Sequence, residues 1–325
     1  MTQADGRRAD VPDLVDRARR GEQLAVARLI SLVEDRGPGL PAVAEALAPH
    51  TGRAHVVGVT GAPGVGKSTS TSAFVTALRA QDRRVGVLAV DPSSPFSGGA
   101  LLGDRVRMSE HTTDDGVFIR SMATRGHLGG LAWATPQALR VLDAAGCDVV
   151  LAETVGVGQS EVEVAGLADT TVLLLAPGMG DGVQAAKAGV LEVADVFVVN
   201  KADRDGAEQT ARDLRNVLAI GAQPGPGGWE RPVLCTSAAR GDGIAELVAA
   251  LDAHRRWLDA SGERIRRRNA RAAAEIQAIA VEKVRAGIDD LRGADGLAHL
   301  ARQVVAGELD PYRAADKLLG RVRPA

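Results

Sequence analysis

The segment Gly61–Ser68, which reads GAPGVGKS, constrains the fold of this chain more than any other feature. It fits the pattern G-x-x-x-x-G-K-[ST], follows the apolar run "HVVGVT" and precedes a stretch with helical spacing. Its glycines let backbone N–H groups turn inward onto phosphate oxygens, and the N-terminus of the following helix adds positive potential. We expect Lys67 to reach the β- and γ-phosphates of a nucleotide and the Ser68 hydroxyl to bind Mg²⁺.

Valine-rich runs alternate with amphipathic stretches between about residues 55 and 255. Runs this apolar suit strands that are covered on both faces, and their alternation with helices predicts an α/β fold with a mostly parallel sheet. Apolar residues at helical spacing before residue 50 and from about residue 262 to 292 predict helical extensions. We expect three parts: residues 1–50 (N-terminal helical extension), 51–258 (P-loop domain) and 259–325 (C-terminal helical extension).

The composition disfavours several classes of protein. The net charge is −2 and aromatic residues make up 2% of the chain, so we expect no nucleic-acid partner. No run of about 18 apolar residues occurs, so we expect no transmembrane helix and no membrane partner. We interpret the two isolated cysteines, Cys147 and Cys235, as small buried hydrophobes. The N-terminal segment lacks the apolar core of a secretory signal, and we expect a cytoplasmic location.

The tetrapeptide Asn200-Lys201-Ala202-Asp203 ends an apolar run and fits the guanine-reading motif N-K-x-D. A carboxylate at Asp203 can accept from both N1–H and the exocyclic amine of guanine, whereas adenine would leave it unpaired. This favours GTP over ATP. Ser237 and Ala238 fit the small-residue loop that backs the guanine O6.

Three acidic residues are candidates for the metal and switch region. Asp91 ends a strand-like run and can face the phosphate-loop Mg²⁺, or it can serve as a turn or cap residue. The Pro/Ser/Gly-rich stretch 92–110 is typical of a switch loop, with Asp104 and Arg105 either acting there or forming a surface ion pair. Glu153 stands where GTPases usually have the Asp of D-x-x-G.

The residues after Glu153 bear on the rate of hydrolysis. Gly156 occupies the glycine position of D-x-x-G, and we expect its N–H to contact the γ-phosphate. Ras-like proteins then place a Gln that orients the attacking water. Here Val157 holds that position and Gln159 lies two residues further on, so we predict slow intrinsic hydrolysis that a partner accelerates.

These segments together resemble the MeaB/ArgK-type GTPases of the SIMIBI class of P-loop proteins. The resemblance is carried across nearly the whole chain by "GAPGVGKST", "VDPSSPFSGGALLGDRVRM", "MATRGHLGGLA", "ETVGVGQSE", "PGMGDGVQAAKAG", "NKAD" and "GELDPYRAADKLL". It implies a homodimeric GTPase chaperone that couples hydrolysis to adenosylcobalamin loading and to protection or reactivation of an acyl-CoA mutase, typically methylmalonyl-CoA mutase. It also implies that Gln184 and Lys187 lie on a segment that responds to the mutase; from the residues alone they could be ordinary surface positions.

Cobalamin itself is expected on the mutase rather than on this chain. Cobalamin-binding domains use D-x-H-x-x-G, and here Arg125 stands where the acid before His127 would be.

The candidate site residues form three groups. The catalytic group is Lys67, Asp91, Asp104, Glu153 and Lys187. The GTP/GDP-binding group is Gly61, Ala62, Pro63, Gly64, Val65, Gly66, Lys67, Ser68, Thr69, Gly156, Asn200, Lys201, Asp203, Ser237 and Ala238. The Mg²⁺ group is Ser68, Asp91 and Glu153.

Two other functions are weighed against this one. A nickel-type metal-insertion GTPase has a related fold, but such proteins carry Cys/His clusters, and here six His and two Cys are scattered. A kinase acting on transport proteins would need a phospho-acceptor site, for which the sequence offers no distinct candidate.

Overall fold

The structure is a computed structural model of the chain. It describes residues 10–35, 39–91, 109–111, 113–123, 134–154, 160–178, 190–220, 225, 227–290 and 296–321. The chain divides into two compact units, Met1–Arg264 and Ile265–Ala325. Each unit is described by itself.

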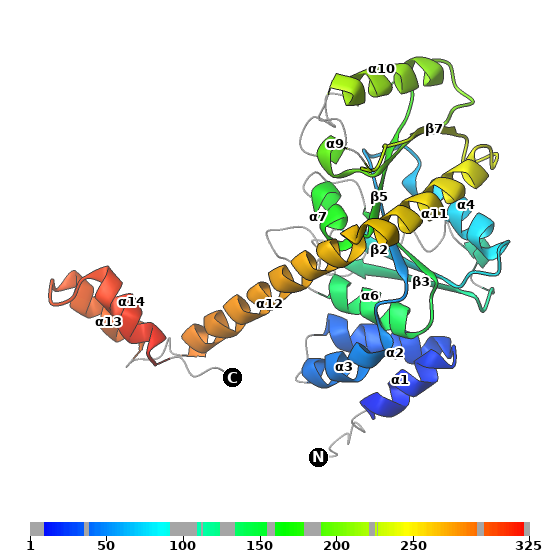
Figure 1. Cartoon of the computed structure of the whole chain (residues 1–325). Helices are drawn as coiled ribbons and strands as arrows, with labels where there is room; N and C mark the ends of the chain where they lie inside the picture. Colours follow the sequence, from blue (N-terminus) through cyan, green and yellow to red (C-terminus); the bar gives the residue numbers. More distant parts are fainter. Residues whose placement is uncertain are drawn as a thin grey trace. The chain divides into compact units, whose positions relative to one another are not determined.

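The first unit is built on a seven-stranded sheet in the order β3-β2-β4-β1-β5-β6-β7 (Figure 1). Every pair of neighbouring strands is parallel, which confirms the predicted α/β fold with a parallel sheet. The strands are β1 (His55–Thr60), β2 (Val85–Asp91), β3 (Val117–Ala123), β4 (Val149–Thr154), β5 (Thr170–Leu175), β6 (Val196–Asn200) and β7 (Val233–Thr236).

Helices cover both faces of this sheet, as the apolar strands require. The helices α4 (Lys67–Arg79) and α11 (Ile244–Ser261) share one core cluster with Val57, Val59 and Leu151. The opposite face, formed by residues such as Val150 and Ala152, packs against α6 (Thr135–Ala144) and α7 (Ser160–Leu167). The helices α9 (Val190–Val193) and α10 (Ala207–Ile220) cover the β5–β7 side.

The predicted N-terminal helical segment is present and belongs to the main core. It comprises α1 (Val11–Arg19), α2 (Gln23–Glu34), α3 (Leu40–Leu47) and the 3₁₀ turn η1 (Ala48–His50). Its fully buried Leu29, Ile30 and Leu47 pack in the same cluster as Ala138 and Leu142 of α6. These helices therefore form an added layer over α6.

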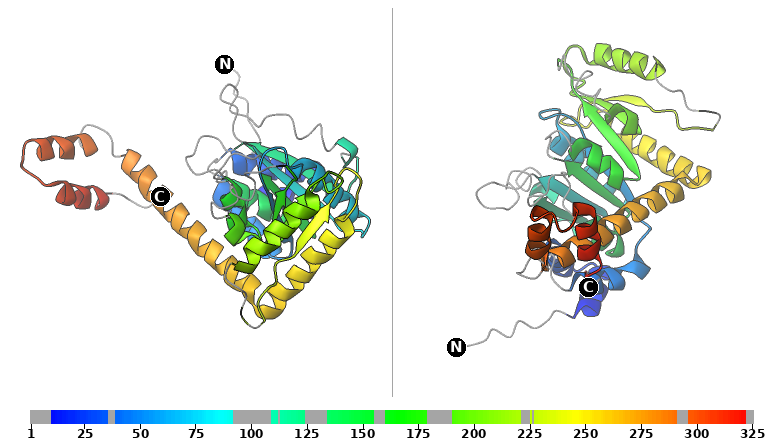
Figure 2. Two further views of the ribbon diagram at one scale, coloured as in Figure 1. Left: turned by 90° about the horizontal axis from the view of Figure 1, so that it is seen from above. Right: turned by 90° about the vertical axis from the view of Figure 1, so that its left-hand side faces the viewer.

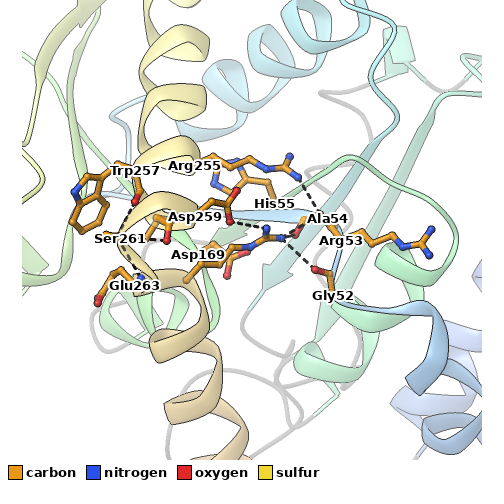
Figure 3. A network of polar contacts seen from close by, with 12 residues as sticks. Gly52, Arg53, Ala54, His55, Asp169, Arg255, Trp257, Asp259, Ser261 and Glu263 are labelled. Atoms are coloured by element: carbon orange, nitrogen blue, oxygen red, sulfur yellow. Dashed lines mark hydrogen bonds and ion pairs between the residues drawn. The ribbon is translucent and has the colours of Figure 1, made fainter.

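The three residues ahead of β1 are held on both sides of their backbone. The Asp143 carboxylate accepts hydrogen bonds from the N–H groups of Gly52, Arg53 and Ala54 at 2.5, 3.1 and 2.8 Å. Arg264 donates to the carbonyl oxygens of the same three residues at 3.2, 3.3 and 3.5 Å (Figure 3). This arrangement, which we call the 52–54 clamp, anchors the amino end of the central strand.

A buried polar chain lies at the same amino edge of the sheet. His55 Nε2 lies 2.7 Å from Thr170 Oγ1, which lies 2.7 Å from His254 Nδ1. His254 Nε2 in turn lies 3.4 Å from Asp195 Oδ1. Burial lowers the pKa of His55 to about 4, so this imidazole is neutral at pH 7. The chain thus ties β1, β5 and α11 together without a buried charge on His55.

The second unit contains most of α12 (Glu263–Asp290), together with α13 (Leu297–Val305) and α14 (Pro311–Leu319). Helices α13 and α14 lie side by side and enclose a small core of Leu300, Ala314 and Leu318 (Figure 2). Asp310 caps α14 by accepting from the next two backbone N–H groups. Within the described residues, no helix combines the length and the apolar character needed to cross a bilayer.

Candidate nucleotide site

The phosphate loop spans the six residues between β1 and α4, at the carboxyl edge of the sheet. Gly61, Gly64 and Gly66 have φ values of 145°, 80° and 95°, which side chains rarely adopt. A Cβ at Gly61 would strike the backbone oxygen of Leu174, and one at Gly66 would lie 2.6 Å from Asn200 Nδ2. The tight loop therefore requires glycine at both ends, in agreement with the sequence motif.

The Lys67 amine lies folded against this loop. Its Nζ donates to the carbonyl oxygens of Gly61 at 2.6 Å and Ala62 at 3.1 Å. Lys67 is buried, and a buried ammonium is tolerated only where acceptors surround it. A phosphate oxygen carries more negative charge than a peptide oxygen and would be a stronger partner for this amine.

The adjacent residue, Ser68, contacts Glu153, the acid at the D-x-x-G position of the sequence. Its Oγ donates to Glu153 Oε1 at 2.7 Å. Glu153 is almost fully buried, and it pairs in the sheet with Val59 of β1 and Ala89 of β2. Ser68 and Glu153, two residues of the candidate Mg²⁺ group, therefore lie in direct contact at the carboxyl edge of the sheet.

Asp91, the third predicted metal-site residue, ends β2 at the same edge as Glu153. Val90 pairs with Thr154, so the backbone of Asp91 lies next to the end of β4. Hard oxygen donors such as the Ser68 hydroxyl and the Glu153 carboxylate are the ligands that Mg²⁺ prefers. Mg²⁺ also keeps several waters and uses substrate phosphates, so two protein oxygens beside a phosphate loop fit it.

Asn200 joins the phosphate loop to the predicted base-reading loop. Its Nδ2 donates to the Val65 carbonyl at 2.9 Å. Its Oδ1 accepts from the Ala238 N–H at 3.1 Å and the Thr236 hydroxyl at 3.2 Å. The Asn200 side chain therefore links β6, the end of β7 and the phosphate loop through three hydrogen bonds.

Lys201 reinforces this connection from the next position. It adopts a left-handed φ of 60°, uncommon for a residue with a side chain, and its Nζ donates to the Gly64 carbonyl at 2.6 Å. The strained backbone places the amine over the phosphate loop. Asn200 and Lys201 thus brace the phosphate loop from two successive positions of the Asn-Lys-x-Asp motif.

Asp203 is held by the loop that follows β7. Its Oδ1 accepts from the Ser237 hydroxyl at 2.8 Å, and its Oδ2 lies 3.7 Å from Arg240 Nη2. The Ser237 hydrogen bond, and more weakly the Arg240 charge, lower the pKa of the Asp203 carboxyl, so it is ionised at neutral pH. An ionised, oriented carboxylate is the form that can accept two hydrogen bonds from guanine.

Three of these contacts, made by Ser237, Thr236 and Arg240, were not predicted from the sequence. The sequence placed Ser237 in the loop that backs the guanine O6, and in the structure its hydroxyl donates to the Asp203 carboxylate. The roles of Thr236 and Arg240 were missed, because a hydroxyl at a strand end and an arginine in a loop have no distinctive local pattern.

Several candidate residues lie outside the described part of the chain. These are Asp104, Arg105, Arg125, His127, Gly156, Val157, Gln159, Gln184 and Lys187. For Asp91 only the backbone is described. The described side chains include no group of three or more His, Cys, Asp or Glu placed to hold a metal ion.

A parallel sheet with a glycine phosphate loop after β1 and an Asn-Lys-x-Asp loop braced against it defines a P-loop GTPase. The chain belongs to the MeaB family, described as methylmalonyl-CoA mutase-associated GTPases, which it matches over residues 26–290.

Three similar proteins agree with this assignment. A Pyrococcus horikoshii protein that carries a provisional GTPase name is 45% identical over 96% of this chain and 98% of its own length. The Escherichia coli GTPase ArgK is 39% identical over 78% of each chain. The mouse mitochondrial methylmalonic aciduria type A homolog is 38% identical over 81% of this chain and 64% of its own length.

A solved structure, named as a LAO/AO transport system kinase, superposes with a TM-score of 0.70 at 30% identity. The match covers 96% of this chain and 97% of that one.

Proposed function

We propose that this chain binds GTP with Mg²⁺ and hydrolyses it slowly to GDP. We further propose that it couples hydrolysis to adenosylcobalamin loading and to protection or reactivation of methylmalonyl-CoA mutase or a related acyl-CoA mutase. The observation that carries guanine-nucleotide binding is Asn200, whose amide bonds both the phosphate loop and the loop beside Asp203. Membership of a mutase-associated family supports the coupling. The cobalamin is assigned to the mutase.

The described side chains supply three roles in this proposal. Lys67 exchanges its two backbone carbonyl partners for phosphate oxygens. Ser68 contributes its hydroxyl to Mg²⁺, while Glu153, now its hydrogen-bond partner, holds the metal directly or through a water. Asp91 is proposed as a further metal-associated carboxylate because β2 ends beside β4.

Glu153 gives a direct test of the metal role. Because Glu153 is proposed to act on the metal rather than on the base, Glu153→Ala should lower GTP turnover far more than GTP affinity. Turnover by phosphate release and affinity by fluorescent-nucleotide titration measure the two effects. Equal losses in both would contradict the assignment.

The remaining proposed residues are expected to set the rate of GTP hydrolysis. Asp104 and Lys187 are proposed as catalytic, and Gly156 as a γ-phosphate contact. Val157 leaves the usual Gln position empty, so Val157→Gln should raise basal turnover. An unchanged rate would contradict the explanation of slow hydrolysis, while GTP binding itself would remain supported.

We propose that the chain forms a homodimer through residues 259–325. In support, α12 exposes Ile276 at 67% and Val281 at 61% of their surface, and apolar side chains on a long helix usually face a partner. Light scattering should give the mass of two chains, and Ile276→Glu should reduce it to one. A monomeric wild type would contradict this part.

The coupling is tested by measuring GTP turnover with and without purified methylmalonyl-CoA mutase, with the mutase either holding or lacking adenosylcobalamin. We expect turnover to rise on adding the mutase, and to differ between its two cofactor states. If the mutase changes neither turnover nor nucleotide affinity, the coupling is wrong. If the chain does not hydrolyse GTP at all, the enzymatic proposal is wrong as well.

A further inference from the structure

A second polar cluster, of which Ser72 and His111 are buried, joins α4 to residues 110 and 111 one helical turn beyond the phosphate contacts. Ser72 Oγ lies 2.5 Å from Glu110 Oε1 and 3.0 Å from His111 Nε2. His111 Nε2 also lies 3.3 Å from the backbone oxygen of Ser72. Ser72 and His111 are both buried, at 7% and 9% exposure. The nucleotide chemistry described above uses none of these three side chains.

The directions of these hydrogen bonds follow from the chemistry of the groups. A backbone oxygen only accepts, so His111 Nε2 carries the proton and donates to Ser72 O and Oγ. The Ser72 hydroxyl then donates to the Glu110 carboxylate. The result is a chain of donors that runs from the buried His111 and Ser72 to the carboxylate of Glu110, whose side chain is 67% exposed.

The position of Ser72 on α4 connects this cluster to the phosphate site. Ser72 lies four residues after Ser68, so the two hydroxyls share one face of the helix about 6 Å apart. Ser68 bonds Glu153 of β4, whereas Ser72 bonds residues of η2 (Ser109–His111), which leads into β3. One helix face is therefore held at two successive turns, by strand β4 at Ser68 and by η2 at Ser72.

We propose that Ser72, with Glu110 and His111, is a positioning cluster that sets where α4 presents the Ser68 hydroxyl to Mg²⁺. This deepens the proposed function and rests on it. An α-helix is stiff over a single turn, so a shift of the helix at Ser72 moves Ser68 relative to Glu153. The cluster touches neither nucleotide nor metal, and its effect is expected in metal affinity rather than in the chemical step.

The test is the Mg²⁺ dependence of GTP turnover in the full-length chain. Ser72→Ala removes one hydroxyl and should raise the half-saturating Mg²⁺ concentration about 3- to 10-fold, the equivalent of one lost hydrogen bond. The maximal rate at saturating Mg²⁺ should stay within about 2-fold of wild type. Ser72→Thr keeps the hydroxyl and should restore the wild-type Mg²⁺ dependence.

The matched control is Ser70→Ala on the same helix. Ser70 is 1% exposed, and its hydroxyl has no hydrogen-bond partner among the described residues. Its removal should leave the Mg²⁺ dependence unchanged. His111→Gln, which retains an N–H donor, should shift the Mg²⁺ dependence less than His111→Leu. Thermal unfolding of each variant separates a general loss of stability from a change in metal affinity.

The outcomes separate the two proposals. If Ser72→Ala lowers stability without shifting the Mg²⁺ dependence relative to Ser70→Ala, the positioning role is overturned and the GTPase proposal stands. If wild-type turnover is absent or independent of Mg²⁺, the proposed metal chemistry fails and the positioning role fails with it.

Discussion

The two edges of the central sheet use charged residues in opposite ways. At the carboxyl edge, the ammonium groups of Lys67 and Lys201 bond neutral backbone carbonyls of the phosphate loop. At the amino edge, Asp143 accepts three backbone N–H groups, and Arg264 bonds three carbonyls and the Asp259 carboxylate at 3.0 Å. The ammonium groups of Lys67 and Lys201 would form stronger hydrogen bonds if phosphate oxygens replaced their carbonyl partners, whereas Asp143 and Arg264 would not.

This difference indicates which edge of the sheet can still bind a ligand favourably. A cation on a peptide oxygen forms a stronger bond when a phosphate replaces that oxygen, so the carboxyl edge favours an anionic ligand. A charge already satisfied by several backbone groups and an opposite charge gains nothing from a ligand. We therefore expect substitutions at the carboxyl edge to change activity and those at the amino edge to change stability.

The largest expected effect is at Lys67. Lys67→Ala should lower the rate of GTP turnover about 100- to 1000-fold, because it removes a cation from the developing phosphate charge. The free energy of unfolding should change less than turnover does, since the amine bonds the carbonyl oxygens of Gly61 and Ala62 within the phosphate loop itself. Turnover assays and urea denaturation measure the two quantities. A large loss of stability with near-normal turnover would reverse the comparison at this edge.

The acid sensitivity of the amino edge is the next largest effect. Burial lowers the pKa of His55 to about 4 from the usual 6.5, so between these values the unfolded chain binds more protons than the folded one. The free energy of unfolding should therefore fall as pH drops through this window, by about 3 kcal/mol in total from this residue. The charge of Asp169 opposes the shift, and Arg255 and Arg264 support it.

Denaturation of wild type and His55→Gln at pH 7.5, 5.5 and 4.5 measures this contribution. Carboxyl groups titrate in both proteins, so the informative quantity is the difference between the two at each pH. That difference should shift in favour of His55→Gln as pH falls. A constant difference would show that His55 does not titrate in this range.

The 52–54 clamp should make a smaller contribution to stability. Asp143→Ala leaves three backbone N–H groups without their carboxylate, and we expect a loss of about 2 kcal/mol in the free energy of unfolding. GDP affinity at saturating Mg²⁺ should stay within about 2-fold of wild type, because the phosphate loop lies at the other end of β1. Asp143→Asn keeps an acceptor oxygen and serves as the milder control. A larger effect on GDP affinity than on stability would contradict the expectation that the amino edge serves stability.

The smallest effect is expected at Arg240. Its ion pair with Asp203 spans 3.7 Å, and the Arg240 side chain is 64% exposed, so water screens the interaction. Arg240→Ala should weaken GDP binding less than about 5-fold. Ser237→Ala, which removes a 2.8 Å hydrogen bond to the same carboxylate, should weaken it more. The reverse order in nucleotide titrations would assign the orientation of Asp203 to the arginine.

Local patterns predicted the parts of the site that depend on local geometry. The glycines of the phosphate loop were identifiable because their backbone angles exclude most other residues. The apolar runs between about residues 55 and 255 predicted buried strands, and their alternation with helices predicted a mostly parallel sheet. The position of Glu153 after a buried strand predicted a place at the metal and switch region; in the structure its carboxylate accepts from the Ser68 hydroxyl at 2.7 Å, and its metal role stays a prediction.

Contacts between distant segments could not be predicted in the same way. Asn200 bonds Val65, and Ser72 bonds Glu110 and His111, through side chains whose types are common in many settings. The 52–54 clamp joins α6 and the start of α12 to a linker that had no distinctive sequence pattern. None of these contacts has a fixed spacing along the chain.

By itself, the sequence determined the phosphate loop, the base-reading motif and the succession of strands and helices along the chain, because short-range backbone geometry and apolar patterning decide them. The tertiary structure alone decided the strand order β3-β2-β4-β1-β5-β6-β7, and with it which residues meet at each edge. The packing of helices on both faces selects that order, and it brings Lys67, Glu153 and Asn200 to one edge and the 52–54 clamp to the other. Packing of this kind depends on the whole chain at once, which no single segment encodes.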